Sequence, residues 1–172
     1  MKGKTIAESN TIMTELIMPN DANPLGNLMG GNLMRWMDIA AGICASRHSD
    51  SFVVTASVDH VSFNEAIQVG EVITLSAKVT RSFNSSMEIF IEVFAAKIPE
   101  NIPRKSNQAY FTFVALDKKT LKPKKVGPVI PLTDEEQKRY EAALRRRDLR
   151  LVLSGRKEAK DAKELREFFS KL

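Results

Sequence analysis

The amino-acid sequence predicts an α+β fold in which one curved antiparallel sheet wraps around a long central helix, with a helical extension at the C-terminal end. An apolar helical pattern lies early in the chain, and several long strand patterns follow it. The segments between those strands are short, whereas parallel strands need crossovers of about a dozen residues or more. The strands are therefore expected to be antiparallel neighbours.

Residues 11–18 form the first expected strand, which Pro19 ends. A loop over residues 22–31, which contains Gly and Asn residues, leads into a helix expected over residues 32–47. This helix is apolar on almost every side, and such helices are normally buried. Because a single sheet leaves part of the helix uncovered, we expect a second subunit to close the gap.

The central part of the chain contains the remaining strand patterns. In one of them apolar and polar side chains alternate strictly, which places the apolar set on one face. Turn-forming Gly, Asn, Ser and Pro residues separate the strands, as in a series of hairpins. These strands are expected over residues 52–63, 71–83, 87–98 and 108–116.

The end of the chain has a different composition. Residues 121–131 are rich in Pro and Lys, as in a linker, and Thr133 with Glu136 then matches a helix capping box. The expected organisation is a domain over residues 1–132 and a charged helical extension over residues 133–172, with helices at 134–152 and 156–169.

The composition is that of a soluble globular protein, with 43% hydrophobic and 27% charged residues. The single cysteine, Cys44, excludes an intramolecular disulfide and a Cys-rich zinc site, and it is expected to pack as a small apolar residue. The apolar run at residues 39–45 is far shorter than the ~20 residues that span a bilayer. Since the N-terminal residues show no apolar signal segment, we expect a cytoplasmic protein without a membrane span.

The net charge of +5 is divided between +2 in residues 1–132 and +3 in residues 133–172. Charges of both signs mix in the second segment, as on a solvated helix face, so no nucleic-acid partner is expected. A modest positive potential can equally attract an anionic small molecule. The sequence contains no metal-ligand cluster, phosphate-binding loop or dinucleotide fingerprint, and no cofactor is expected.

Asp38 is the most unusual residue of the expected helix. It is the only acidic residue between Asp21 and Asp50, and its neighbours in sequence are mostly apolar. Burying a carboxylate is costly, so such groups are usually paired, protonated or catalytic. The structural alternative is an Asp38 side chain that pairs with Arg35 or Asn32 on the preceding turn.

The segment over residues 19–38, PNDANPLGNLMGGNLMRWMD, resembles the signature of hotdog-fold acyl-CoA thioesterases. More narrowly, it is similar to the branch that contains the brain-type cytosolic acyl-CoA hydrolases and the small bacterial acyl-CoA thioesterases. Its specific part is the combination of Asn23, Gly26, Gly30, Gly31 and Asp38. The resemblance covers about residues 9–132 and implies the hotdog fold, dimers that join their sheets, and hexamers built as trimers of dimers.

The resemblance also implies the hydrolysis of acyl-CoA thioesters to a free acid and CoA, with each active site at a dimer interface. Asp38 would act as general base, or as nucleophile through an anhydride. Asn23 of the partner subunit would position the water or the thioester carbonyl, although Asn23 alone is also a natural turn residue. Backbone N–H groups at Gly30 and Gly31 would form the oxyanion hole at the start of the helix.

CoA enters this interpretation as part of the substrate and product, not as a cofactor. Residues that fall where the family pattern would place contacts with the substrate or CoA are Gly26, Gly30, Val58, Asp59, His60, Ser85 and Ser86. Arg81 and Arg104 are among the basic residues that are candidates for holding the CoA phosphates, and their alternative role is that of solvated loop charges.

Two other functions remain open at this point. A hotdog hydratase that acts on unsaturated acyl thioesters would use an Asp/His pair near the central helix, and the absence of any His before His48 weighs against it. An acyl-CoA-binding or sensing module would bind the same ligand without turnover.

Overall fold

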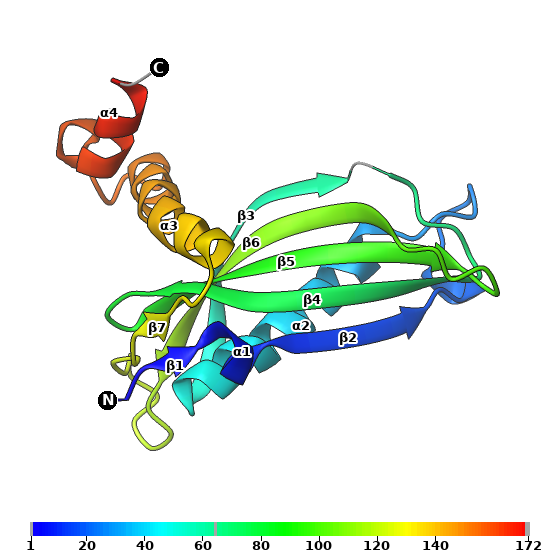
Figure 1. Ribbon diagram of the computed structural model, residues 1–172, viewed down its shortest axis with the longest axis horizontal. Helices are drawn as coiled ribbons and strands as arrows, with labels where there is room; N and C mark the ends of the chain where they lie inside the picture. Colours follow the sequence, from blue (N-terminus) through cyan, green and yellow to red (C-terminus); the bar gives the residue numbers. More distant parts are fainter. Residues whose placement is uncertain (1, 64, 171–172) are drawn as a thin grey trace. The chain divides into compact units, whose positions relative to one another are not determined.

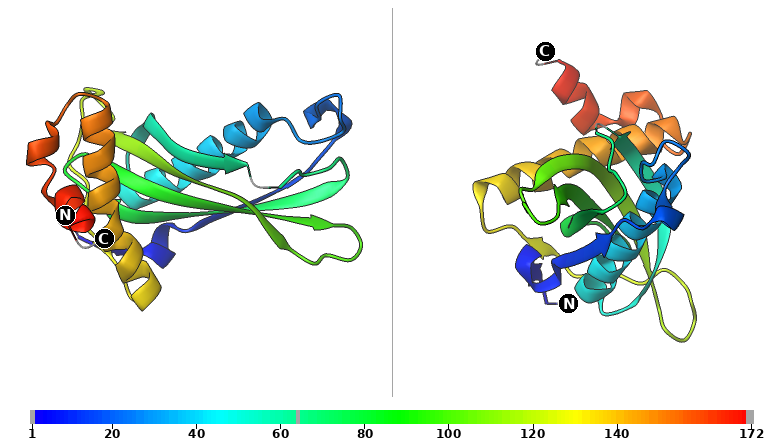
Figure 2. Two further views of the ribbon diagram at one scale, coloured as in Figure 1. Left: turned by 90° about the horizontal axis from the view of Figure 1, so that it is seen from above. Right: turned by 90° about the vertical axis from the view of Figure 1, so that its right-hand side faces the viewer.

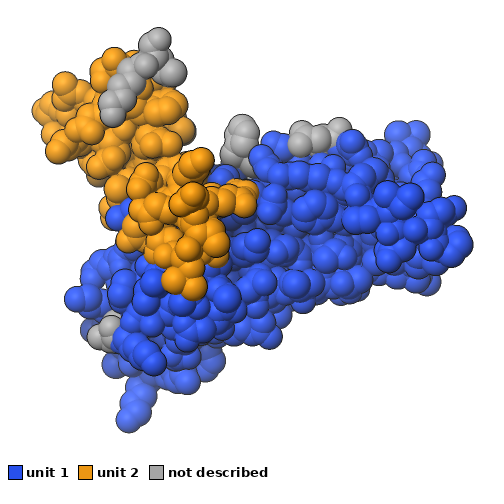
Figure 3. Space-filling model, in the orientation of Figure 1, with its two compact units in different colours: residues 1–130 blue, residues 131–172 orange. Residues whose placement is uncertain are grey.

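The computed structural model describes residues 2–63 and 65–170. The chain divides into two compact units, Met1–Ile130 and Pro131–Leu172, which Figure 3 colours separately. The elements of the first unit, in chain order, are β1 (Lys4–Thr5), α1 (Ile6–Ser9), β2 (Thr11–Leu16), the 3-10 turn η1 (Pro19–Asp21), α2 (Gly30–Ser49), β3 (Phe52–Phe63), β4 (Glu71–Ser82), β5 (Ser86–Lys97), β6 (Arg104–Leu116) and β7 (Val129–Ile130).

The main sheet of the first unit has the strand order β2-β4-β5-β6-β3, and every neighbouring pair is antiparallel. α2 runs along one face of this curved sheet (Figures 1 and 2). The predicted α+β fold, with an antiparallel sheet around a long central helix, is therefore confirmed. β2 and β3 are the two edges of the sheet, and β1 pairs separately with β7.

The core lies between α2 and the sheet. The apolar set of β4 that the sequence alternation predicts is fully buried, and α2 contributes Met37, Ala41 and Cys44 without exposed surface. The ring of Phe113 lies 3.5 Å from where a Cβ would stand at Gly42, so this face of β6 packs on the helix. Each large aliphatic side chain buried here contributes about 1.5–3 kcal/mol to stability.

The boundaries differ from the sequence expectation at two places that matter for the site. α2 begins at Gly30, two residues earlier than expected, so Gly30 and Gly31 belong to its first turn rather than to the loop before it. β6 begins at Arg104 instead of residue 108, because residues 104–107 pair with β5 although their side chains are mostly polar. Pairing with a neighbouring strand overrides local composition there.

The edge strand β3 is irregular. Its register against β6 shifts between Thr55 and Ser57 and again between Asp59 and Ser62. Such bulges bend a strand and redirect its side chains, and they are frequent near active sites.

The second unit contains α3 (Asp134–Leu153), the 3-10 turn η2 (Ala159–Asp161) and α4 (Lys163–Phe169). The predicted capping box is present, since the N–H of Glu136 donates to Thr133 Oγ1 at 3.2 Å and the N–H of Thr133 donates to Glu136 Oε2 at 3.2 Å. The second predicted helix, over residues 156–169, is too long, because α4 begins only at Lys163 and the short η2 precedes it. Among the described residues, no helix is long and apolar enough to cross a membrane.

Candidate active site

Asp38 and Thr55 form the contact at the centre of the candidate site. Thr55 Oγ1 donates a hydrogen bond of 2.6 Å to Asp38 Oδ1, and so it joins the middle of α2 to the edge strand β3. No described residue donates a hydrogen bond to the second oxygen, Oδ2. The bond to Thr55 fixes the orientation of the carboxylate and leaves that oxygen available for chemistry.

Within the described part of the chain, Asp38 does not pair with Asn32 or Arg35, the structural alternative that the sequence left open. The Asn32 amide lies 3.4 Å from both Asp21 O and Asp21 Oδ1. The guanidinium of Arg35 lies over the ring of Trp36, 5.7 Å from its centre. Neither residue on the preceding turn pairs with Asp38 in the described contacts.

Within the single chain Asp38 is half-buried, not enclosed. Large apolar side chains on α2 and on the same face of β3 as Thr55 remain exposed, with exposed fractions of 39% for Ile39, 40% for Ile43 and 37% for Val58. Apolar surface of this extent next to a carboxylate is typical of a face that another molecule covers.

Asn23 lies in the loop before α2 and shapes its turn. Asn23 Oδ1 accepts hydrogen bonds from the N–H groups of Leu25 at 2.9 Å and Asn27 at 3.1 Å. The N–H of Asn23 donates to Asn27 O at 2.7 Å, and the N–H of Gly26 donates to Asn23 O at 2.9 Å. The turn thus occupies the side-chain oxygen, and the Nδ2 amide is the part of Asn23 that can donate to a ligand.

The first turn of α2 lies beside this loop. The N–H groups of a first turn have no partner within the helix, and the helix dipole favours negative charge there. A Cβ at Gly30 would lie 3.2 Å from the ring of Phe63, whereas no atom lies within 4 Å of a Cβ at Gly31. A side chain at position 30 would therefore press against the ring of Phe63, whereas the space beside Gly31 is open.

A cavity of about 270 Å³ lies at this end of the sheet. Asn23 and Gly30 line it together with Phe63 at the end of β3 and Asn107 of β6. The structure thus brings Asn23 and the helix start together around one hollow.

Asn23 and Asp38 do not meet within one chain. The hydrogen bonds that the structure describes for Asn23 all lie in its own loop. Asp38 lies about 12 Å farther along the helix axis than Gly30, because each helical residue rises ~1.5 Å. One chain alone therefore holds the two predicted catalytic side chains apart.

The other predicted substrate-contact residues fall into separate groups. Gly26 belongs to the Asn23 loop, where its carbonyl accepts from the N–H of Val69 at 3.1 Å. Val58 lies opposite Phe111 in β6, on the face that packs against α2, and so shares the face of Thr55. These two residues lie near the candidate site.

Four predicted residues lie elsewhere on the sheet. Asp59 and Arg81 stand opposite Tyr110 and Glu88, which places them on the face away from α2. Ser85 and Ser86 lie in and after the turn between β4 and β5, at the end of the sheet where α2 ends. The backbone of His60 belongs to β3, and its side chain lies outside what the structure describes.

Thr55 is the site residue that sequence reasoning missed. It stands in a strand rich in Val and Thr, where nothing distinguishes it from Thr residues that only favour strand structure. Its contact with Asp38 depends on the packing of β3 against α2, which the sequence does not reveal.

The remaining reactive side chains lie away from Asp38. His48 is buried ten residues farther along α2, and its Nε2 lies 3.2 Å from Gly127 O. Burial lowers the pKa of His48 and raises that of the Cys44 thiol to about 12, so both are held neutral. No group of three or more metal-ligating side chains occurs among the described residues.

The chain is similar in sequence to known thioesterases. A family model described as the thioesterase superfamily matches residues 25–101. Mouse acyl-coenzyme A thioesterase 11 is 40% identical over 140 residues, which are 81% of this chain and 23% of that protein. Mouse cytosolic acyl coenzyme A thioester hydrolase is 38% identical over 139 residues, which are 80% of this chain and 36% of that protein. The chain thus spans about a quarter to a third of the length of these two relatives.

A relative of similar length also matches. Protein VdlD of Helicobacter pylori is 34% identical over 146 residues, which are 85% of this chain and 83% of that protein.

Two solved structures share the fold over most of their length. An apo-hexameric acyl-CoA thioesterase matches with a TM-score of 0.86 at 34% identity, covering 90% of this chain and 98% of that chain. Acyl-CoA hydrolase from Staphylococcus aureus, in complex with butyryl coenzyme A, coenzyme A and coenzyme A disulfide, matches with a TM-score of 0.81 at 32% identity, covering 97% and 98%. Variants of the latter in which an aspartate, a threonine or an asparagine is replaced by alanine match similarly, and the asparagine variant is in complex with coenzyme A.

Proposed function

The chain belongs to the thioesterase superfamily with the hotdog fold, and from this premise we propose that it hydrolyses acyl-CoA thioesters to a carboxylic acid and CoA. The observation that carries the proposal is the carboxylate of Asp38, which Thr55 orients beside exposed apolar surface. The aspartate, threonine and asparagine replaced in the Staphylococcus aureus variants have the same spacing in sequence as Asp38, Thr55 and Asn23. That agreement supports the choice of these three residues.

Asp38 can activate the attack on the thioester in two ways. As a general base it would take a proton from water, and the resulting hydroxide would attack the carbonyl carbon and expel CoA as the thiolate. As a nucleophile it would attack that carbon itself, and water would then hydrolyse the mixed anhydride. In both cases the free oxygen Oδ2 reacts while Thr55 holds Oδ1.

The negative charge that develops on the carbonyl oxygen needs donors. The N–H group of Gly31 is suited to this role because it lies in the first turn of α2 beside open space. The Nδ2 amide of Asn23 is a second donor. Because Asn23 and the start of α2 line one hollow, about 12 Å along the helix axis from Asp38, both donors would come from the partner subunit. A dimer in which two chains contribute to each site would bring Asn23 and Asp38 together, which one chain does not do.

The exposed surface supports this assembly. β3 is an edge strand with Phe52 and Val54 exposed by 57% and 47%, and an unpaired edge of this kind readily pairs with another strand. We propose that two copies join along β3 and cover Asp38 and the exposed face of α2. The matched hexameric thioesterase supports a further assembly into trimers of dimers.

The acyl-CoA substrate requires no metal or cofactor in this scheme. Gly26, Gly30 and Val58 are proposed to contact the thioester end of the substrate. Asp59, His60, Arg81, Ser85 and Ser86 stay candidates for the nucleotide end of CoA. The word cytosolic in the name of a relative supports the expectation of a cytoplasmic protein.

Thiol release from a panel of acyl-CoA esters tests the proposal directly. The wild-type protein is expected to release CoA from at least one ester, and Asp38→Asn to lose this activity by about a hundredfold or more. Asp50→Asn is the matched control, because Asp50 pairs with Lys4 at the other end of α2. Full activity in Asp38→Asn would refute the role of Asp38, and binding of acyl-CoA without turnover by the wild type would favour a binding module instead.

The hydratase alternative loses support. The only described histidine side chain on α2 is that of His48, about 15 Å from Asp38 along the helix axis, and it is engaged with Gly127 O.

A further inference from the structure

Arg104, the first residue of β6, holds the start of β4 through a two-pronged ion pair. Its Nη1 lies 2.8 Å from Glu71 Oε1, and its Nη2 lies 2.9 Å from Glu71 Oε2. The Glu71 residue is only 2% exposed. Burial raises the pKa of Glu71, but the hydrogen bonds from Arg104 and from the N–H of Gln68 outweigh it, so the pKa lies below its usual value.

The same guanidinium also holds the segment before β4. Arg104 Nε donates to Glu65 Oε2 at 3.0 Å, and Nη2 donates to Ala66 O at 2.9 Å. Glu71 Oε2 accepts from the N–H of Gln68 at 2.8 Å. Both members of the ion pair thus fix the backbone over residues 65–71.

This segment in turn supports the Asn23 loop. The N–H of Leu28 donates to Ile67 O at 2.7 Å, and the N–H of Val69 donates to Gly26 O at 3.1 Å. An isolated bridge joins Asn27 to Gln68, and Asn27 makes two of the four described hydrogen bonds that fix Asn23. A continuous set of hydrogen bonds therefore leads from Arg104 to the proposed donor amide.

We propose that Arg104 and Glu71 are positioning residues for the thioesterase reaction, which hold the Asn23 loop in its working geometry without touching the substrate. The inference rests on the proposed function for its catalytic part. The side chain of Arg104 is 36% exposed, and an ion pair with a partly exposed member contributes little net stability, so a geometric role explains the bidentate contact better than stability does. A guanidinium can hold two carboxylate oxygens and a carbonyl at fixed angles, which an ammonium group cannot.

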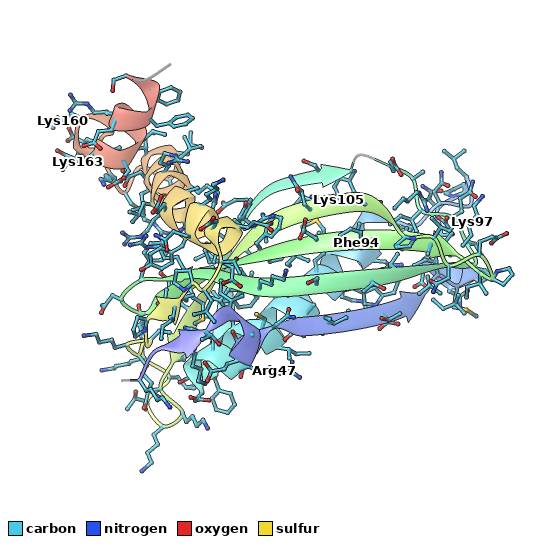
Figure 4. All side chains as sticks on the ribbon, viewed as in Figure 1. Arg47, Phe94, Lys97, Lys105, Lys160 and Lys163 are labelled. Atoms are coloured by element: carbon cyan, nitrogen blue, oxygen red, sulfur yellow. The ribbon has the colours of Figure 1, made fainter. Side chains whose placement is uncertain are left out.

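The test compares Arg104→Lys and Glu71→Gln with the control Lys105→Gln. Lys105, labelled in Figure 4, follows Arg104 directly and pairs with Glu92 at 2.9 Å, and no described hydrogen bond joins its side chain to residues 65–71 or to the Asn23 loop. In Arg104→Lys we expect kcat to fall by about tenfold, with KM for the acyl-CoA ester changed by less than about twofold. Combined with Asn23→Ala, Arg104→Lys is expected to cause no further loss, because both act through the same amide.

Hydrogen exchange gives a readout that does not depend on activity. The amides of Leu28 and Val69 are expected to exchange about tenfold faster in Arg104→Lys than in the wild type, and at the wild-type rate in Lys105→Gln. Unchanged exchange and unchanged kcat in a folded Arg104→Lys protein would overturn the inference, and so would losses that add to those of Asn23→Ala. If Arg104→Lys does not fold, Glu71→Gln is judged by the same criteria. A wild-type protein without turnover would refute the proposed function alone, since the exchange measurement still decides whether Arg104 holds the loop.

Discussion

Thr55 Oγ1 lies 2.6 Å from Asp38 Oδ1, and this short hydrogen bond links the central helix to the edge strand of the sheet. It gives β3 a role in orienting the carboxylate as well as in closing the sheet. The register of β3 against β6 shifts directly after Thr55, between Thr55 and Ser57. Such a bulge changes the direction of the side chains that follow it.

The hydroxyl of Thr55 is expected to matter more than its methyl group. Thr55→Val removes the donor while keeping the shape, and we expect kcat to fall by about tenfold or more with little change in the unfolding temperature. Thr55→Ser keeps the donor and is expected to retain most of the activity. Full activity in Thr55→Val with a loss in Thr55→Ser, measured by thiol release, would show that packing and not the hydrogen bond is needed.

Asn23 has two separable tasks. Asn23→Asp keeps an oxygen that can accept from the N–H groups of Leu25 and Asn27, but it removes the amide donor. We expect it to keep the wild-type unfolding temperature and to lose activity by about a hundredfold, as when one oxyanion donor is removed. Asn23→Ala is expected to lower both quantities, because it also removes the acceptor of the turn. Wild-type activity in Asn23→Asp would assign Asn23 to loop structure alone.

If each active site combines Asp38 of one subunit with Asn23 of the other, two inactive variants should restore activity when they form a mixed dimer. Coexpression of an Asn23→Ala chain with an Asp38→Asn chain produces mixed dimers in which one of the two sites has both residues intact. With random pairing, about a quarter of the wild-type activity is expected to return. Thiol release by the purified mixture measures this, with each single variant as its control. No recovery in verified mixed dimers would place both residues in one chain's site.

The two glycines at the start of α2 are expected to respond differently to alanine. Gly30→Ala places a methyl group 3.2 Å from the Phe63 ring, and we expect a destabilisation of about 1 kcal/mol or more. Gly31→Ala meets no atom within 4 Å, so its free energy of unfolding is expected to stay within about 0.5 kcal/mol of the wild type. Its thioesterase activity should fall, because the added methyl group occupies the space beside the proposed oxyanion donor. Chemical denaturation and thiol release separate the two effects.

The burial of His48 is expected to make the stability of the protein depend on pH. Burial lowers its pKa in the folded state below the ordinary value of 6.5, so the unfolded chain binds a proton more readily. The free energy of unfolding should therefore decrease as the pH falls below about 6.5, by up to ~1.4 kcal/mol per pH unit until the pKa of the folded state is reached. Denaturation curves between pH 7.5 and pH 5 measure this decrease, and His48→Gln is expected to remove most of it. An identical decrease in the variant would assign the effect to other groups.

The sequence predicts the fold well because its strongest signals are periodic. The alternation in β4 and the apolar pattern of α2 define which faces are buried, and their burial in the structure follows. Very short strands cannot be predicted in this way, because they contain too few residues to show a periodic pattern. β1 and β7 consist of two residues each and exist because Lys4 pairs with Val129, a contact that no local pattern can reveal.

The candidate site is less accessible from sequence. Asp38 and Asn23 stand out through composition and through their resemblance to a family signature, so they could be proposed from the sequence. Thr55 could not, and Arg104 could be named only as a candidate for the CoA phosphates, because their proposed roles depend on partners far away in the chain, at Asp38 and at Glu71. Thr and Arg residues are common in proteins, and the sequence does not show which of them contact an active-site residue in the folded chain.

The pairing of β1 with β7 also affects how the protein is made. During synthesis the first strand has no partner until Val129 and Ile130 have left the ribosome, almost the full length of the first unit later. β3 is synthesised long before β6, its neighbour in the sheet, so its apolar residues stay unpaired in the interval. Contacts between such distant segments slow folding and prolong the exposure of aggregation-prone strands. A nascent chain of this protein is therefore expected to depend on chaperones most strongly between the emergence of β3 and that of β6.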